Sequence, residues 1–263
     1  MNYNITDIEN IVTWQAEFAG QTLQWVGEDN QEQYEKKLNN ANTRRQLEQS
    51  GWLTNTLTYQ FNSHGFRSPE FDPTNDHFCA FGDSVTAGVA LNYNQIYSTI
   101  IESKIGISCY NFGQAGGSDS TSVRLALTWL PKLAPKFVIY QSTFKHRFEW
   151  IEPWHGQRNP AGIKNPQQAV IYGVQPHGGG SSPSTQSDLY QHWINIDTNR
   201  ELLAVKNLMT MRYLCQEMQI PLIEISIDDF FSKLDDKGRD LLHPGPKIHR
   251  IQAERILEKL NES

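Results

Sequence analysis

From His77 to the end of the chain, short apolar runs alternate with longer amphipathic stretches. Four apolar runs bounded by turn residues have the length and composition of strands buried on both faces: His77–Phe81, Ile107–Phe112, Phe137–Gln141 and Leu222–Ile225. Four amphipathic stretches predict helices: Tyr93–Ser103, Ser122–Leu133, Asn199–Met218 and Lys247–Leu260. Strands and helices that alternate at these lengths predict an α/β fold, a three-layer α/β/α sandwich with a parallel, flavodoxin-like sheet.

Local signals indicate where two of these helices begin. Thr198 and Glu201 have the spacing of a capping box, which predicts that the third helix begins there. Pro246 falls at the first position of the last helix, where its missing N–H removes no helical hydrogen bond.

Two segments depart from this alternation. Residues 1–70 are polar, rich in amides and mostly helical in pattern, so we expect an N-terminal extension packed on the main domain, 71–263. The apolar anchors of the extension are Trp14, Phe18, Leu23 and Trp25. Near its end, Tyr59–Arg67 alternates and then turns, as an edge strand or a hairpin does. An insertion at about 154–188 is rich in Pro and Gly and has no period, so it is either a lid or a mobile surface loop.

Charge and cysteine usage exclude several classes of partner. The net charge is −6 and no block of Lys or Arg occurs, which argues against nucleic acid or an anionic membrane as a partner. Cys79, Cys109 and Cys215 lie in apolar runs without metal-ligand spacing, so we expect buried free thiols and no metal site. Buried thiols suit a reducing compartment, and the first residues lack a signal-peptide pattern. We therefore expect a cytoplasmic protein with no membrane-spanning segment.

A serine follows the first predicted strand directly, in the run Gly82-Asp83-Ser84-Val85-Thr86. Open α/β sheets bind their ligands at the carboxyl ends of strands, and a helix that starts at Ser84 would present backbone N–H groups to an anion. Taken alone, the Gly-Asp-Ser tripeptide is explained as well by an ordinary turn. Ser84 needs a base before it can act as a nucleophile.

Asp240 and His243 supply that base and a group to orient it. A carboxylate three residues before a histidine reaches its Nδ1–H within a tight turn, which leaves Nε2 free to accept a proton from Ser84. A lone histidine before a helix is usually a surface residue, so the hypothesis depends on the three residues together. A third segment, Asn111–Ser118, follows the second strand, and its glycines permit close approach of backbone N–H groups to a ligand. An ordinary glycine-rich turn explains that segment equally well.

These three segments, in this order, resemble the blocks of the SGNH (GDSL-type) hydrolase family over residues 77 to 260. Gly82–Thr86 looks like the nucleophile block, Asn111–Gly116 like the second block, and Asp240–Pro244 like the last block. Asn62–Arg67 also resembles a segment that precedes the nucleophile in some members. The resemblance implies an SGNH hydrolase fold, ester or acyl hydrolysis without metal or cofactor, and a role for the Gly116 N–H as oxyanion donor.

The third block of the family is absent here. The family reads Gly-x-Asn-Asp after the third strand and uses the asparagine side chain as an oxyanion donor, whereas this chain continues Gln141-Ser142-Thr143-Phe144. Loss of one such donor costs on the order of 100- to 1000-fold in rate. We expect Thr143 or Gln141 to replace it. Nearby, Arg147 and Glu149 have the spacing of a plain ion pair that supports the loop.

The sequence therefore predicts a serine-dependent carboxylic ester hydrolase that acts on a small-molecule or glycan ester. Aromatic residues in or beside the insertion suit sugar rings or acyl chains and favour a carbohydrate O-acetyl esterase: Phe144, Phe148, Trp150, Trp154 and Trp193. Two alternatives stay open, an O-acyltransferase that acts on a glycan and a catalytically weak SGNH-like carbohydrate-binding or structural module. The oligomeric state is not indicated by the sequence.

Overall fold

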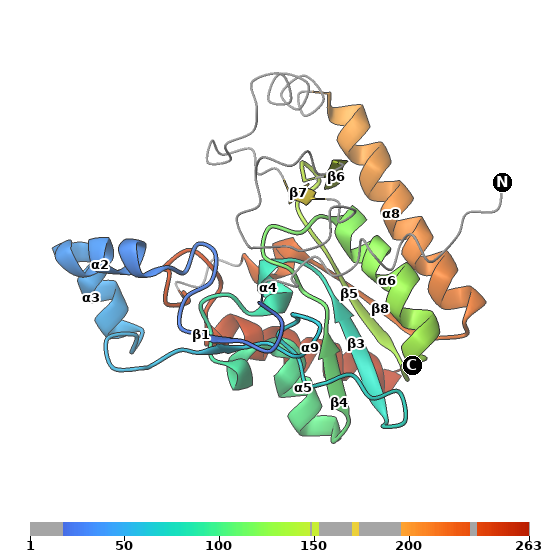
Figure 1. Ribbon diagram of the computed structural model, residues 1–263, viewed down its shortest axis with the longest axis horizontal. Coiled ribbons are helices and arrows are strands. Elements are labelled where there is room, and N and C mark those ends of the chain that lie inside the picture. Colours follow the sequence, from blue (N-terminus) through green and yellow to red (C-terminus); the bar gives the residue numbers. More distant parts are fainter. Residues whose placement is uncertain (1–17, 148, 153–169, 174–195, 232–235, 263) are drawn as a thin grey trace.

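A computed structural model describes residues 18–147, 149–152, 170–173, 196–231 and 236–262. A parallel sheet lies between two pairs of helices in these residues, and the N-terminal helices lie at one end of the molecule (Figure 1). Trp14, Phe148, Trp154, Trp193 and most of the predicted insertion lie outside the described residues. No helix in the described part of the chain is long and apolar enough to cross a membrane.

The sheet has four parallel strands in the order β4-β3-β5-β8. Their bounds are β3 His77–Phe81, β4 Ser108–Asn111, β5 Val138–Ser142 and β8 Leu222–Ser226. Each lies within one residue of its predicted bounds, and the order is that of a flavodoxin-like sheet. The predicted fold class is therefore confirmed. The strand order reverses beside β3, which places the carboxyl end of β3 where such sheets bind ligands.

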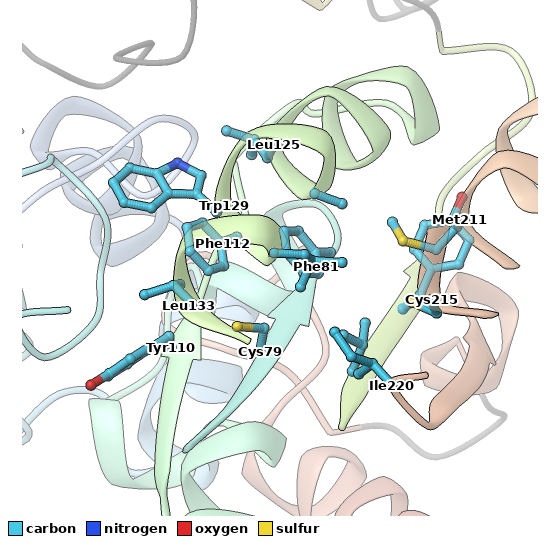
Figure 2. Close-up of a cluster of buried hydrophobic side chains, with 14 of the residues drawn as sticks. Cys79, Phe81, Tyr110, Phe112, Leu125, Trp129, Leu133, Met211, Cys215 and Ile220 are labelled. Atoms are coloured by element: carbon cyan, nitrogen blue, oxygen red, sulfur yellow. The ribbon is translucent and has the colours of Figure 1, made fainter. Parts of the chain in front are cut away.

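Helices cover both faces of this sheet: α5 Tyr97–Ile105 and α9 Pro246–Glu262 on one face, α6 Asp119–Leu133 and α8 Asp197–Glu217 on the other. Successive residues of β3 alternate between the two layers, as a strand buried on both faces requires. Phe78 and Ala80 pack toward α5 and α9, whereas Cys79 and Phe81 pack toward α6 and α8. Figure 2 shows the second cluster, in which Phe81 lies among side chains of α6 and α8.

The three cysteines are buried free thiols, as predicted. The last helix begins at Pro246, as predicted. The capping box at the start of α8 is wrong: the helix begins at Asp197 with Ile196 as its N-cap and no side-chain cap. Thr198 already lies in the first turn, and Glu201 instead pairs with Lys145 Nζ at 2.8 Å.

The predicted helix over Tyr93–Ser103 is two elements. A 3-10 turn, η2 (Tyr93–Gln95), precedes α5, and the extended backbone of Ile96 separates them. The Asn92 N–H donates to the Gln95 side chain, which closes a capping box on the short turn. Local polar pairing therefore ends the first element after one turn.

The N-terminal extension contains β1 (Thr22–Leu23), α2 (Gln31–Asn39), α3 (Ala41–Gln49) and β2 (Tyr59–Gln60). Of the two alternatives predicted for Tyr59–Arg67, the structure shows a strand and not a hairpin, because β2 pairs with the upstream β1 in an antiparallel ribbon. Leu47, Trp52, Tyr59 and Leu91 form one buried cluster.

Part of the predicted insertion is a strand: β7 (Val170–Gly173) pairs antiparallel with β6 (Glu149–Glu152).

Candidate active site

Ser84 is the first residue of a single helical turn, α4 (Ser84–Ala87), and two residues, Gly82 and Asp83, separate it from the end of β3. Asp83 is the N-cap, and its Oδ1 accepts a hydrogen bond from the Val85 N–H at 3.0 Å. Gly82 is needed between strand and cap, because a Cβ there would lie 2.3 Å from Thr86 Oγ1. Ser84 is buried, with 6% of its surface exposed. The local sequence thus presents the hydroxyl at the carboxyl end of the sheet.

Asp240 and His243 lie on a tight turn that faces Ser84. The backbone N–H groups of Leu242 and His243 both donate to Asp240 Oδ1 at 3.0 Å, which fixes the carboxylate. Its other oxygen, Oδ2, is hydrogen-bonded to His243 Nδ1, and His243 Nε2 lies 2.8 Å from Ser84 Oγ. The structure therefore brings together the three residues that the sequence predicted as nucleophile, base and orienting carboxylate.

The contact between Asp240 and His243 shifts the pKa of both groups away from their ordinary values. Burial lowers the pKa of His243, but the hydrogen bond and the charge of Asp240 outweigh it, and the net effect is a pKa above the usual 6.5. For Asp240, burial raises the pKa, but His243 and two backbone N–H groups together lower it by more. The pKa of Asp240 therefore lies below its ordinary value. An aspartate that stays ionised can stabilise an imidazolium that forms during a reaction.

The loop after β4 lies against α4. Asn111 Nδ2 donates to the Thr86 carbonyl at 2.7 Å, and Asn111 Oδ1 accepts the Gly113 N–H at 2.8 Å. A Cβ at Gly113 would lie 2.2 Å from the Ala87 backbone nitrogen, so this contact requires glycine. Further along the loop, Gly116 has a φ of +75°. Within the described part of the chain, neither the Gly116 N–H nor the Ser84 N–H has a hydrogen-bond acceptor.

Gln141 and Thr143 both hold the N-cap carboxylate of α4. Gln141 Nε2 donates to Asp83 Oδ1 at 3.2 Å, and its Oε1 accepts from Thr86 Oγ1 at 2.6 Å. Thr143 Oγ1 donates to Asp83 Oδ2 at 2.8 Å. The side-chain donors that we expected to replace the missing asparagine are therefore engaged with Asp83 in this structure.

Arg147 completes the set of donors to Asp83, a role that the sequence did not reveal. Its NH1 lies 2.6 Å from Asp83 Oδ2 and 3.0 Å from Thr143 Oγ1, and both charged side chains are buried. The predicted Arg147–Glu149 ion pair is wrong, because Glu149 pairs with Arg124 on α6 at 2.8 Å. Two buried ion pairs thus form in place of the single predicted pair, and each joins the segment after β5 to another element.

Gln114 is a second residue that the sequence did not single out. It lies in the same loop as Gly116, its N–H donates to the Gly82 carbonyl at 3.1 Å, and its side chain is buried. Neither Nε2 nor Oε1 of Gln114 finds a hydrogen-bond partner in the described structure. A buried amide without a partner is uncommon and calls for an explanation. The sequence did carry one indication of a role for Gln114, since it is an amide side chain within the glycine-rich loop Asn111–Ser118.

Phe144 packs at the edge of the cluster beneath α5 and α9, and its ring lies 5.7 Å from that of Phe231. Among the residues that the structure describes, no group of three or more His, Cys, Asp or Glu could hold a metal ion. A cleft of about 760 Å³ lies between the extension and η2, and its lining includes one carboxylate, Glu70, and two aromatic residues, Phe61 and Tyr93. Half of its twelve lining residues are carboxamides: Asn55, Gln60, Asn62, Asn92, Asn94 and Gln95.

No protein-family model matches the chain, and no curated protein matches it in sequence. Solved structures with a similar fold include esterases and lipolytic proteins of the SGNH and G-D-S-L families. A mutant of the esterase AlinE4 is 17% identical with a TM-score of 0.33, over 57% of this chain and 58% of that one.

Two further neighbours are also esterases. The acetyl xylan esterase Est2A from the rumen bacterium Butyrivibrio proteoclasticus is 12% identical with a TM-score of 0.38, over 74% of this chain and 64% of that one. The esterase EstA from Pseudoalteromonas sp. is 12% identical with a TM-score of 0.36, over 72% of this chain and 100% of that one. The chain thus spans less than two thirds of the AlinE4 and Est2A structures. At these identities and TM-scores the case for an activity rests on the site itself.

Proposed function

We propose that this protein is a serine-dependent carboxylic ester hydrolase that works through an acyl-enzyme. The observation that carries the proposal is the chain of contacts from Asp240 through His243 Nδ1 and Nε2 to Ser84 Oγ, with 2.8 Å between the last two atoms. That distance is within the reach needed for direct proton transfer from a nucleophile to a base.

The reaction proceeds in two halves. Ser84 Oγ attacks the ester carbonyl as its proton passes to His243 Nε2, and Asp240 stabilises the resulting imidazolium. His243 then gives that proton to the departing alcohol oxygen, which leaves the acyl group on Ser84. In the second half, His243 takes a proton from water, the hydroxide adds to the acyl carbonyl, and the proton returns to Ser84 Oγ as the acid leaves.

The developing oxyanion needs donors that are free in the resting site. The N–H groups of Ser84 and Gly116 meet this requirement, as does the buried side-chain amide of Gln114. We favour Gln114 as the third donor over Gln141 and Thr143, since those two already donate to Asp83. An amide donor that has no other partner loses no hydrogen bond when it turns to a substrate oxygen.

For the alcohol portion of the ester we propose a glycan, with an acetyl group as the acyl portion. The cleft beside η2 supports this class, because carboxamides donate and accept hydrogen bonds and so suit an uncharged, hydroxyl-rich ligand. One of its walls, Asn92–Gln95, continues the chain that leaves α4. Acyl transfer to a glycan differs only in the acceptor, and the partition of the acyl group between water and added glycan separates the two reactions.

Hydrolysis of an aryl acetate by matched serine variants tests the proposal. Ser84→Ala is expected to lower kcat by roughly 10⁴-fold or more, since removal of the nucleophile abolishes the acyl-enzyme route. Ser103→Ala is the control, because Ser103 is exposed on α5 and its hydroxyl donates to the Ile100 carbonyl within the same helix. Equal turnover by Ser84→Ala, Ser103→Ala and the unsubstituted protein would rule the proposal out.

A further inference from the structure

A buried ion pair joins the N-terminal extension to the turn that carries the catalytic histidine. Arg239, which directly precedes Asp240, donates from Nε to Asp29 Oδ1 at 3.0 Å and from NH2 to Asp29 Oδ2 at 2.7 Å. Both side chains are buried, and the guanidinium lies 3.9 Å from the centre of the Trp25 ring. A two-point Arg–carboxylate pair fixes orientation as well as distance. Residue 29 therefore constrains the backbone next to Asp240.

Asp29 also reaches the loop that leaves the nucleophile turn. Its Oδ2 accepts a hydrogen bond from the Tyr59 hydroxyl at 2.5 Å, and the same hydroxyl accepts the Ala90 N–H at 2.8 Å. The Ala90 carbonyl in turn accepts the Arg239 N–H at 2.9 Å. Asp29, Tyr59, Ala90 and Arg239 thus form a closed ring of buried hydrogen bonds. This ring clamps the loop after Ser84 against the turn before His243.

Both clamped segments contain a non-glycine residue in the left-handed region, Ala90 with a φ of +64° and Leu241 with a φ of +55°. Such conformations persist only where the surroundings impose them. The Leu241 N–H donates to the Gly238 carbonyl at 2.9 Å, and Ala90 is held from both its N–H and its carbonyl by the ring. Loss of the ring would remove the contacts that hold Ala90 in this conformation.

We propose that Asp29 is a positioning residue for the site: it sets the placement of His243 Nε2 relative to Ser84 Oγ through Arg239 on one side and through Tyr59 and Ala90 on the other. The inference rests on the proposed function, and it makes the N-terminal extension a working part of the hydrolase. Misplacement of a catalytic group by about 1 Å can cost roughly 100-fold in rate. The effect should fall on kcat, because Asp29 does not face the site.

The test compares Asp29→Asn with Glu32→Gln, which removes an exposed carboxylate paired with Lys36 in the same extension. Asp29→Asn keeps the shape of the side chain and removes the charge that Arg239 requires. We expect its kcat on an aryl acetate to fall at least 10-fold with little change in KM, while Glu32→Gln matches the unsubstituted protein. Far-UV circular dichroism should show both variants folded at the assay temperature.

A second readout does not depend on turnover. The proton between His243 Nδ1 and Asp240 gives a far-downfield NMR signal when the two groups are held together, and Asp29→Asn should broaden or lose it. If Asp29→Asn fails to fold, Tyr59→Phe serves instead. It removes the hydroxyl that bonds to Asp29 and Ala90 and keeps the aromatic side chain in place. A folded variant with the unaltered kcat and the unaltered NMR signal would overturn the inference. An inactive unsubstituted protein that still shows the signal, with loss of the signal in Asp29→Asn, would instead overturn the proposed function alone.

Discussion

At the scale of single residues, the Asp83 carboxylate receives more hydrogen bonds than an N-cap usually does. Val85, Gln141, Thr143 and Arg147 all donate to it. A buried carboxylate is tolerated only when it is paired and hydrogen-bonded, and here three of the four donors come from β5 and the segment that follows it. Residues 141–147 therefore fix the turn on which Ser84 lies.

The same substitution at two buried glutamines should separate their roles. Gln114→Met removes an amide that has no partner in the described structure, so the free energy of unfolding should stay the same or rise. If Gln114 donates to the oxyanion, kcat should fall by about 100- to 1000-fold. Gln141→Met removes bonds to Asp83 and Thr86, and it should lower the free energy of unfolding by about 1–3 kcal/mol. Chemical denaturation and steady-state kinetics measure both. Unaltered kcat in Gln114→Met would show that another group holds the oxyanion.

The pKa of His243 sets the acid limb of the activity profile. A general base must be neutral, so kcat/KM should fall as the pH drops through the pKa of His243. Since Asp240 raises that pKa above 6.5 despite burial, the midpoint of the limb should lie above pH 6.5. A pH series of aryl acetate hydrolysis, with protein stability checked at each pH, measures the midpoint. A profile flat from pH 5 to 9, or a midpoint well below 6.5, would contradict the assignment of His243 as base.

At the scale of elements, the site consists of three loops at the carboxyl edge of the sheet, and their packing requires glycine at Gly113. A Cβ there would lie 2.2 Å from the backbone nitrogen of Ala87, which cannot move unless α4 moves with it. Gly113→Ala should therefore lower the free energy of unfolding by about 1–3 kcal/mol and also lower kcat. Gly106→Ala is the control: its φ is +77°, so it carries conformational strain, but its Cβ would meet nothing within 4 Å. Equal kcat for the two variants would contradict the packing argument.

The strands could be predicted from sequence because each is a short apolar run buried on both faces, and most helices because their apolar residues fall on one face. The errors lie where a distant partner decides the outcome. The capping box at Thr198 was wrong because Glu201 pairs with Lys145. Tyr59–Arg67 forms a strand but not the alternative hairpin, because β2 pairs with the upstream β1. The ion pair of Arg147 was mispredicted because its partner, Asp83, lies 64 residues away. Sequence spacing carries no information about such contacts.

At the scale of the whole molecule, residues far apart in the chain meet at one edge of the sheet. Ser84 and His243 are 159 residues apart, and Asp29 and Arg239 are 210 apart. The nucleophile, base and orienting carboxylate could be proposed from the sequence, because each lies in a recognisable motif at a strand or helix end. Asp29 could not, because nothing in the local pattern of the extension distinguishes it from the other acidic residues there.

The most direct test of the central claim is the reaction of the protein with an alkyl fluorophosphonate, followed by mass spectrometry of the digested adduct. The account predicts one adduct per chain, located on Ser84, and a labelling rate that falls at least 100-fold in His243→Ala because the base is lost. Absence of an adduct, an adduct on another residue, or a rate that does not depend on His243 would contradict it.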